Sequence, residues 1–213
     1  EYRPHNWPEI VGQDAVVNIL KAQVQRKSWG HAYILAGPSG VGKTSVARIF
    51  AAALTCAKTR AGGPCGKCGS CKAIVAGSHW DVIEYDAASN RGIEEARELA
   101  RRAFLGPMGP AKVYIIDEAH GLTVPAWDAL LKTLEEPPPY LVWMFCTTNP
   151  ASIPQTVISR CQALRLSAIE PAAVAKHLAE VAQREKKPMD VGGLRFIAEQ
   201  ASGNLRAALS TLE

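Results

Sequence analysis

The segment Gly37-Pro-Ser-Gly-Val-Gly-Lys-Thr44 constrains the fold of this chain more than any other feature. It matches the pattern G-x-x-x-x-G-K-[ST], whose glycines let backbone N–H groups turn inward around phosphates. An apolar run typical of a strand precedes it, and a helical stretch over 46–54 follows it. The N-terminus of that helix adds partial positive charge. The sequence therefore predicts a strand–loop–helix unit that binds a nucleotide, with a chance glycine-rich turn as the alternative.

The two polar residues that end the motif have defined roles in such a unit. Lys43 is expected to reach the β- and γ-phosphates, and Thr44 is expected to hold Mg²⁺. The residues expected to contact the nucleotide phosphates are Gly37, Pro38, Ser39, Gly40, Val41, Gly42, Lys43, Thr44 and Ser45.

Short, branched, apolar runs recur along the first 168 residues. We expect strands at 33–36, 82–85, 113–116, 141–146 and 163–166. Runs of this kind are typical of strands buried on both faces of a parallel sheet. Amphipathic helical patterns lie between them, as right-handed crossovers require. The sequence predicts an α/β fold built on a five-stranded parallel sheet.

The strand pattern stops near residue 168, and three helical patterns follow. Pro171 suits the first turn of a helix that runs to Arg184, Asp190 suits the cap of a second, and a third covers 205–212. We expect a nucleotide-binding α/β domain over 1–168 and a three-helix lid over 169–213. Because the chain starts without Met and stops within a helical pattern, we also expect a piece of a longer protein. No apolar run of 18 or more residues is present, so no membrane span is expected.

Two carboxylates, Asp117 and Glu118, end the apolar run Val113-Tyr-Ile-Ile. At a strand tip, Asp117 is expected to join the Mg²⁺ shell, and Glu118 is expected to polarise the attacking water as a general base. An adjacent acid suits hydrolysis better than transfer of phosphate to a second substrate. The simpler interpretation is a solvated strand end, which the preceding phosphate loop disfavours.

Four of the six cysteines cluster in a Gly- and Lys-rich segment. They are Cys56, Cys65, Cys68 and Cys71. Two C-x-x-C steps that share a residue, plus one outlying cysteine, can close a tetrahedral Cys₄ zinc site with no open position, which indicates a structural metal. An iron–sulfur cluster is possible with the same thiolates, and a disulfide set is the weaker alternative. Cys146 and Cys161 are expected to be small buried residues in or beside strands.

Together these motifs resemble the gamma/tau family of bacterial DNA polymerase III clamp-loader subunits, which are AAA+ ATPases. The resemblance covers nearly the whole chain and rests on elements that occur in the same order: Tyr2-Arg3-Pro4, Val11-Gly12-Gln13, His31-Ala32-Tyr33, the phosphate loop, the cysteine insertion at 56–71, Asp117-Glu118-Ala119-His120, the segment 129–138 and Ser159-Arg160-Cys161. Two positions depart from the family pattern, Ser39 and Gly121, and neither removes a catalytic group.

The resemblance implies roles for further residues. Thr148 is similar to a sensor of the γ-phosphate, and Asn149 beside it shares that task in an alternative assignment. Arg160 resembles an arginine finger that acts in trans on ATP held by a neighbouring subunit. Arg206 resembles a second sensor, on the lid. The residues similar to the family's adenine pocket are Ile10, Val11 and Leu205.

The resemblance also implies cofactors, partners and location. ATP, Mg²⁺ and Zn²⁺ are the expected ligands. The expected partners are delta, delta-prime and further gamma/tau subunits, the sliding clamp and primer–template DNA, within the DNA polymerase III holoenzyme, a nucleotidyltransferase complex of the bacterial cytoplasm. The segment 86–93, with Ser89, Asn90 and Arg91, resembles one that leads to a DNA-facing helix. A simple helix cap is a nearly equal alternative, and a formal net charge of +4 alone does not indicate DNA.

Three other functions fit parts of the pattern. A non-hydrolysing, delta-prime-like subunit is disfavoured by the intact phosphate loop and acidic pair. Another AAA+ DNA motor is disfavoured by the cysteine insertion and the Ser-Arg-Cys element. A small-molecule P-loop kinase requires an acceptor pocket, for which the sequence has no signal.

Overall fold

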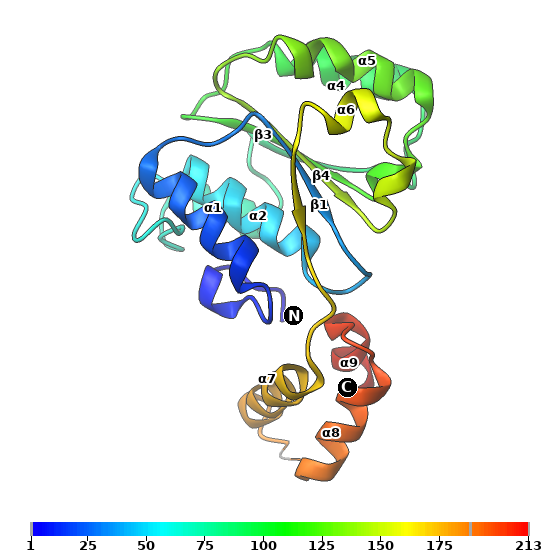
Figure 1. The fold of residues 1–213 in the computed structure, drawn as a ribbon. Coiled ribbons are helices and arrows are strands. Elements are labelled where there is room, and N and C mark those ends of the chain that lie inside the picture. The colour runs from blue at the N-terminus through cyan, green and yellow to red at the C-terminus, as the bar shows by residue number, and fades with distance from the viewer. Residues whose placement is uncertain (1, 188, 213) are drawn as a thin grey trace.

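A five-stranded parallel sheet forms the centre of the computed structural model, which describes residues 2–187 and 189–212 (Figure 1). The strands lie in the order β2-β3-β4-β1-β5, and every neighbouring pair is parallel. Their bounds are β1 (Ala32–Ala36), β2 (Val82–Asp86), β3 (Lys112–Asp117), β4 (Leu141–Thr147) and β5 (Gln162–Arg165). All five overlap the predicted runs, so the predicted α/β fold with a five-stranded parallel sheet is confirmed.

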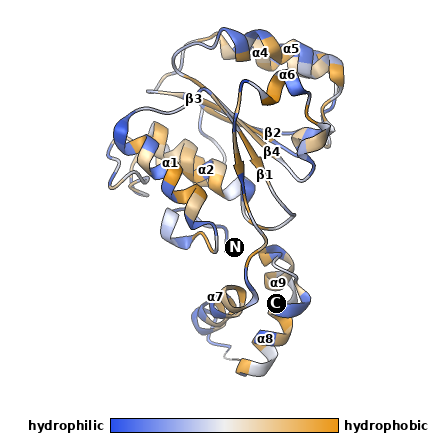
Figure 2. Ribbon diagram, viewed as in Figure 1, coloured by the Kyte–Doolittle hydropathy of each residue, from blue (hydrophilic) through white to orange (hydrophobic). Residues whose placement is uncertain are grey.

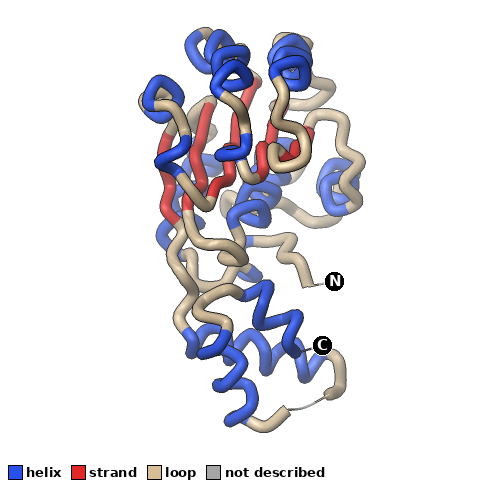
Figure 3. The backbone as a smooth tube through the Cα atoms, turned by 90° about the vertical axis from the view of Figure 1, so that its right-hand side faces the viewer, coloured by secondary structure: helices blue, strands red, loops and turns tan. Residues whose placement is uncertain are grey.

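Helices cover both faces of the sheet because successive strand residues point to opposite sides. Tyr33 and Leu35 of β1 belong to the core beneath two helices, whereas Ile34 belongs to the core on the other face. The first face is covered by α1 (Asp14–Arg26) and α2 (Lys43–Thr55), and the second by α4 (Ile93–Ala103), α5 (Val124–Glu135) and α6 (Gln155–Ile158). Figure 2 shows the hydrophobic residues gathered on the strands, and Figure 3 shows the strands enclosed between the helical layers.

Large aromatic side chains fill the core on the second face. Trp143 is fully buried and stacks on Tyr114 with ring centroids 4.6 Å apart. Trp127 of α5 is also buried and packs against Phe145. Cys146 is buried as predicted, whereas Cys161 is only half-buried.

Three helices gather below the sheet around an apolar cluster of their own (Figures 1 and 3). They are α7 (Pro171–Arg184), α8 (Val191–Gln200) and α9 (Leu205–Leu212). The predicted cap of the second is confirmed, because the Asp190 carboxylate accepts the N–H groups of Gly192 (2.7 Å) and Gly193 (3.0 Å). The outermost residues of the two expected domains, Glu1 and Glu213, lie outside the described residues.

Short elements complete the chain. They are the 3-10 turns η1 (Trp7–Glu9), η2 (Ala119–Gly121) and η3 (Pro150–Ser152) and the helix α3 (Gly69–Val75). Among the described residues, no helix is both long enough and apolar enough to cross a membrane.

The carboxyl ends of the central strands meet at one edge of the sheet. Ala36 at the end of β1 is in register with Thr147 at the end of β4, and β3 ends beside them at Asp117. Open parallel sheets bind ligands outside this edge. The predicted phosphate loop and acidic pair both leave the sheet there.

Candidate nucleotide-binding site and metal centre

The phosphate loop connects β1 to α2 and keeps a buried ammonium group inside its turn. Gly42 precedes the first residue of α2 with a φ of +99°, a backbone conformation that favours glycine. Lys43 begins the helix, and its Nζ donates to the carbonyl oxygens of Gly37 (3.0 Å) and Pro38 (2.8 Å). Burial lowers the pKa of Lys43, and the nearby Glu118 carboxylate partly opposes that shift. The ammonium group of Lys43 therefore lies within the loop, beside the cavity from which a phosphate would approach.

Thr44 and Asp117 are brought together from positions 73 residues apart, and the Thr44 hydroxyl donates to Asp117 Oδ2 over 2.8 Å. Adjacent oxygens of an octahedral Mg²⁺ shell lie about 2.9 Å apart, because the metal–oxygen bonds are 2.0–2.1 Å. The oxygen pair therefore fits two neighbouring positions of such a shell. Both residues also line the cavity described below.

Glu118 adopts an unusual backbone conformation for a residue with a side chain, with φ +47° and ψ +44°. Such residues cost about 1–3 kcal/mol and occur preferentially at functional sites. The Oε2 atom of Glu118 lies 3.3 Å from His120 Nδ1 and 3.4 Å from Thr148 Oγ1. The turn thus aims the carboxylate toward the end of β4, into a group of polar side chains.

Two members of this group, His120 and Thr147, had no predicted role. His120 Nδ1 lies 3.2 Å from Thr147 Oγ1, and Thr147 is fully buried. The Thr147 hydroxyl also accepts the Asn149 N–H, while the Asn149 side chain donates to Ser152 instead of facing Glu118. Of the two predicted sensor residues, only Thr148 contacts Glu118.

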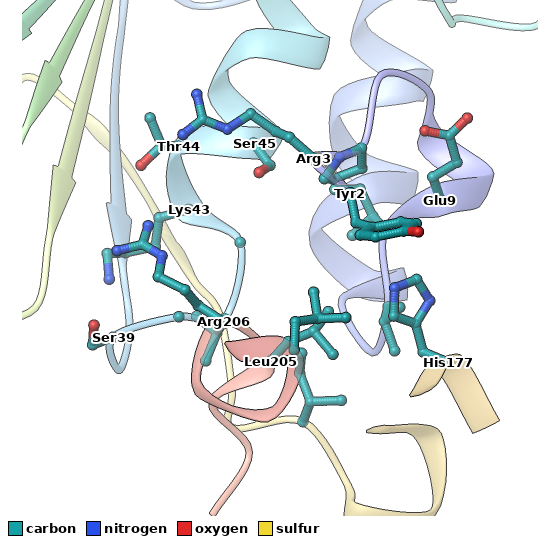
Figure 4. A pocket seen from close by; sticks show the side chains of 18 of the residues that line it. Tyr2, Arg3, Glu9, Ser39, Lys43, Thr44, Ser45, His177, Leu205 and Arg206 are labelled. Carbon is teal, nitrogen blue, oxygen red and sulfur yellow. The ribbon is translucent and has the colours of Figure 1, made fainter. Parts of the chain in front are cut away.

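An open cavity of about 300 Å³ lies between the phosphate loop and the three-helix unit (Figure 4). The backbone N–H of Leu205 in α9 donates to the carbonyl of Gly40 over 3.1 Å, which fastens α9 to the loop. A Cβ atom at Gly40 would lie 1.7 Å from Asn204 Oδ1, so only glycine permits this approach. In Figure 4 the Arg206 side chain extends along the loop toward Lys43.

The cavity collects most of the predicted nucleotide-binding residues. Its lining includes all of Ser39–Ser45, both carboxylates, Arg206 and the three residues of the predicted adenine pocket, Ile10, Val11 and Leu205. The remaining lining residues were not predicted to belong to this site: Tyr2, Arg3, Pro4, Glu9, Ile169, His177, Leu209 and Ser210. They come from the two ends of the chain, and no sequence pattern joins them.

Arg160 does not line this cavity. It follows α6, and its guanidinium donates to Glu135 Oε1 (2.8 Å) and to the carbonyl of Thr156 (2.6 Å). The side chain is partly exposed, at 34%. An arginine in this place can serve a site on another molecule but not the cavity of its own chain.

The segment proposed to face DNA is tied into a local turn. Ser89 Oγ donates to the Asp86 carboxylate (2.7 Å), Asn90 Nδ2 donates to the Asp86 carbonyl (3.1 Å), and Arg91 Nε donates to the Ala88 carbonyl (2.9 Å). Hydrogen bonds from Ser89 and from the Ala88 N–H lower the pKa of Asp86. These contacts favour the structural role of the segment, in the turn before α4.

The four clustered cysteines lie around a common centre. The Sγ–Sγ separations are 3.9 Å for Cys56 and Cys68, 4.0 Å for Cys65 and Cys71, and 3.5 Å for Cys68 and Cys71. All four sulfur atoms lie within 4.8 Å of one another. A tetrahedron with zinc–sulfur bonds of about 2.3 Å has edges of about 3.8 Å. The arrangement fits a Cys₄ metal site, and all four thiols are free rather than paired in disulfides.

The environments of these thiols differ. Backbone N–H groups, that of Lys67 first, lower the pKa of Cys65 to about 6, and the N–H of Cys71 lowers the pKa of Cys68. Burial raises the pKa of Cys56 and raises that of Cys71 to about 12. The lowered pKa values favour the thiolate forms of Cys65 and Cys68, and a bound cation would favour the thiolate forms of the two more buried cysteines.

Comparison with known proteins decides the family. The family model described as DNA polymerase III, delta subunit, matches residues 12–170, which is most of the chain. The chain belongs to the DNA polymerase III delta-subunit family. Relatives named tau or tau/gamma are similar to this chain over nearly its whole length. The DNA polymerase III subunit tau of Bacillus subtilis is 42% identical over 100% of this chain and 38% of its own length.

Two further relatives are also named as tau or tau/gamma subunits. The tau/gamma subunit of Haemophilus influenzae is 40% identical over 99% of this chain and 31% of its own length. The tau subunit of Escherichia coli is 38% identical over 99% of this chain and 33% of its own length. The predicted resemblance to gamma/tau subunits is confirmed, and the chain spans about a third of the length of these relatives.

Solved structures of lower sequence similarity share the fold of this member of the DNA polymerase III delta-subunit family. The Thermotoga maritima RuvB Holliday junction branch migration motor is 18% identical, with a TM-score of 0.71 over 99% of this chain and 64% of that one. A second structure of the same motor, with one residue substituted, gives a TM-score of 0.72 over the same shares of the two chains. These solved structures therefore share the overall fold of the chain.

Proposed function

We propose that this chain binds and hydrolyses ATP as the motor subunit of a DNA sliding-clamp loader. One observation supports this most directly. Lys43, Thr44, Asp117 and Glu118 converge on one cavity at the carboxyl edge of the sheet, and Arg206 enters it from the three-helix unit. A subunit that only held its neighbours would not need a general base beside the metal-binding pair.

In the proposed complex, ATP and Mg²⁺ occupy this cavity in one orientation. The loop N–H groups and Lys43 would hold the phosphates, Thr44 and Asp117 would hold Mg²⁺, and Ile10, Val11 and Leu205 would surround the base. Bound Mg²⁺ would supply charge neutralisation on the phosphate oxygens. We also propose that 169–213 act as a lid, since the Leu205 N–H already bonds to the Gly40 carbonyl.

Glu118 is proposed to take the proton of the attacking water. Its left-handed backbone turn points the carboxylate at Thr148 and His120, which would orient it. Thr148 would thereby connect the Glu118 carboxylate to the end of β4. Arg160 would stabilise charge on ATP held by a neighbouring subunit, because it lies outside the cavity of its own chain.

The cysteine cluster is proposed to hold a structural Zn²⁺. Four sulfur atoms complete a tetrahedral shell and leave no position for water, so the metal would stabilise the fold without taking part in hydrolysis. Arg91 is still proposed to contact the DNA backbone because its exposed side chain is charged, although its Nε, like the side chains of Ser89 and Asn90, is hydrogen-bonded within the turn.

The clamp and DNA steps rest on the gamma/tau resemblance. ATP binding would order the lid and align neighbouring subunits, so that the assembly opens a sliding clamp and grips primer–template DNA in the bacterial cytoplasm. The proposed partners are delta, delta-prime and further gamma/tau subunits. The matching family model is described as a delta subunit. The second candidate function is therefore a subunit that binds nucleotide without hydrolysing it.

Two variants of the full-length protein separate these candidates. Lys43→Ala is expected to abolish ATP binding, and Glu118→Gln is expected to keep binding but to lower turnover at least about 100-fold, the lower end for loss of a general base. ATP binding is measured by calorimetry and turnover by phosphate release in the assembled complex. Exposed Lys176→Ala and Glu199→Gln serve as matched controls. Wild-type turnover in Glu118→Gln contradicts the hydrolytic assignment.

A further inference from the structure

The end of the cavity farthest from Lys43 contains an imidazole that the proposed function does not use. His177 belongs to α7 and lines the cavity together with Ile10, Val11 and Leu205. In Figure 4 its ring lies beside the ring of Tyr2 and on the side of Leu205 away from Lys43. This end combines apolar side chains and two rings with the charged groups of Arg3 and Glu9. Apolar and ring side chains with a few polar groups are typical of a site for a flat aromatic group.

The His177 ring is available for such a group. It is half-buried, and within residues 2–187 and 189–212 no hydrogen bond engages its imidazole nitrogens. Burial lowers the pKa of His177, Glu180 partly opposes that shift and Arg184 adds to it, which favours the neutral ring. A neutral ring can pack against an aromatic face without the removal of water from a charge.

We propose that His177 is a base-binding residue whose ring packs against the purine of the bound nucleotide. The inference rests on the proposed nucleotide site and adds to it a contact from α7. In the proposed orientation, the phosphates lie at Lys43 and the base extends toward Ile10 and Leu205, which places the purine at the His177 end. Base binding would thereby join α7 as well as α9 to the nucleotide.

The contact predicts that His177 acts on the base and not on the phosphates. The test compares ATP with inorganic tripolyphosphate, which carries the phosphates without a base. Both are titrated with Mg²⁺ by calorimetry into the full-length protein, in the Glu118→Gln background so that neither is consumed. His177→Ala is expected to weaken ATP binding about tenfold, within the range for a base stacked on an aromatic side chain, and to leave tripolyphosphate binding unchanged.

Two further variants control for folding and ring chemistry. His177→Phe keeps a ring and is expected to retain ATP affinity within about threefold, since every aromatic ring offers a stacking face. Gln183→Ala replaces an exposed residue of α7 outside the cavity and is expected to change neither affinity.

The outcomes separate this inference from the proposed function. If the Glu118→Gln protein with the native His177 binds ATP more tightly than tripolyphosphate and His177→Ala does not alter that preference, the His177 assignment is wrong and the nucleotide site stands. An equal loss of both ligands in His177→Ala also overturns it, because it indicates a displaced α7. If the protein with the native His177 binds neither ligand, both the nucleotide site and the base contact are wrong.

Discussion

The cysteine cluster and the nucleotide cavity are both built around a short motif, but they depend on the fold in different ways. All four sulfur ligands lie between residues 56 and 71, and the turn and first helical residues that carry them set their geometry. The cavity joins the phosphate loop to residues from both ends of the chain, from Tyr2 to Ser210. A local motif specifies nearly the whole of the first site and only the phosphate end of the second.

Among the substitutions that test this difference between the two sites, Cys71→Ser is expected to have the largest effect. Loss of one buried ligand is expected to remove most of the zinc, measured by metal analysis, and about 3–4 kcal/mol of stability. That loss corresponds to a fall of roughly 10 °C in Tm for a chain of this size. Cys161→Ser, outside the cluster, is the matched control and should keep its zinc. Full zinc content in Cys71→Ser contradicts the four-ligand site.

A second substitution addresses the contact between the phosphate loop and α9. Gly40→Ala is expected to displace Asn204 and weaken ATP binding roughly 10- to 100-fold, the range for ångström-scale misplacement of binding groups. Gly77→Ala is the control, because its φ of +69° is similar to the +73° of Gly40 but nothing lies within 4 Å of its Cβ position. Both should lose about 1–2 kcal/mol of stability through backbone strain.

Calorimetry with ATP and thermal unfolding distinguish the two glycine variants. We expect ATP affinity to fall in Gly40→Ala but not in Gly77→Ala. The zinc content should not change in either variant. Equal ATP affinities in the two variants would mean that α9 does not need its close approach to the loop.

The smallest predicted effect concerns a hydrogen-bond chain that joins the cysteine segment to the end of α2, the helix that begins at the phosphate loop. Ser70 Oγ, next to Cys71, donates to Thr55 Oγ1 at the end of α2 (2.8 Å) and lies 2.9 Å from His79 Nε2. Because His79 Nδ1 accepts the Asp81 N–H, the neutral ring carries its proton on Nε2 and donates it to Ser70. Burial lowers the pKa of His79, which favours this neutral form.

Ser70→Ala is expected to leave the His79 N–H without a partner and to cost about 1 kcal/mol, or roughly 2–4 °C in Tm. Zinc content and ATP affinity should not change, because neither site contains Ser70. Ser78→Ala, which removes an exposed contact of 3.4 Å, is the control. A large loss of ATP affinity in Ser70→Ala would show that the two regions are coupled more strongly than the contrast allows.

The sequence was sufficient to predict the site residues that lie together in one short motif. The loop from Ser39 to Ser45 and the strand tip at Asp117 each lie within one motif, and the structure brings the two together as expected. The central strands β1, β3 and β4 were predictable because both of their faces are buried and apolar. The edge strands β2 and β5 have exposed positions and only overlap the predicted runs.

Contacts set by packing between distant segments were not predictable. His120 meets Thr147 because β3 and β4 are neighbours, an order that the sequence does not reveal. The predicted sensor Thr148 contacts Glu118, but no pattern in the sequence indicated that the buried hydroxyl of the preceding residue would contact His120. His177 is one histidine in an amphipathic helix, and only the packing of α7 against the N-terminal segment brings it to the cavity.

The proposed action of Arg160 in trans distinguishes an assembled motor from an isolated nucleotide-binding chain. The most direct measurement is steady-state ATP turnover of the full-length protein assembled with delta and delta-prime subunits, with and without primed DNA and clamp, for wild type and Arg160→Ala. The account predicts strong stimulation by DNA and clamp and a loss of about 1,000-fold in Arg160→Ala, the lower end for an arginine finger, with ATP affinity retained. Turnover that responds neither to DNA and clamp nor to the Arg160 substitution would contradict the clamp-loader mechanism.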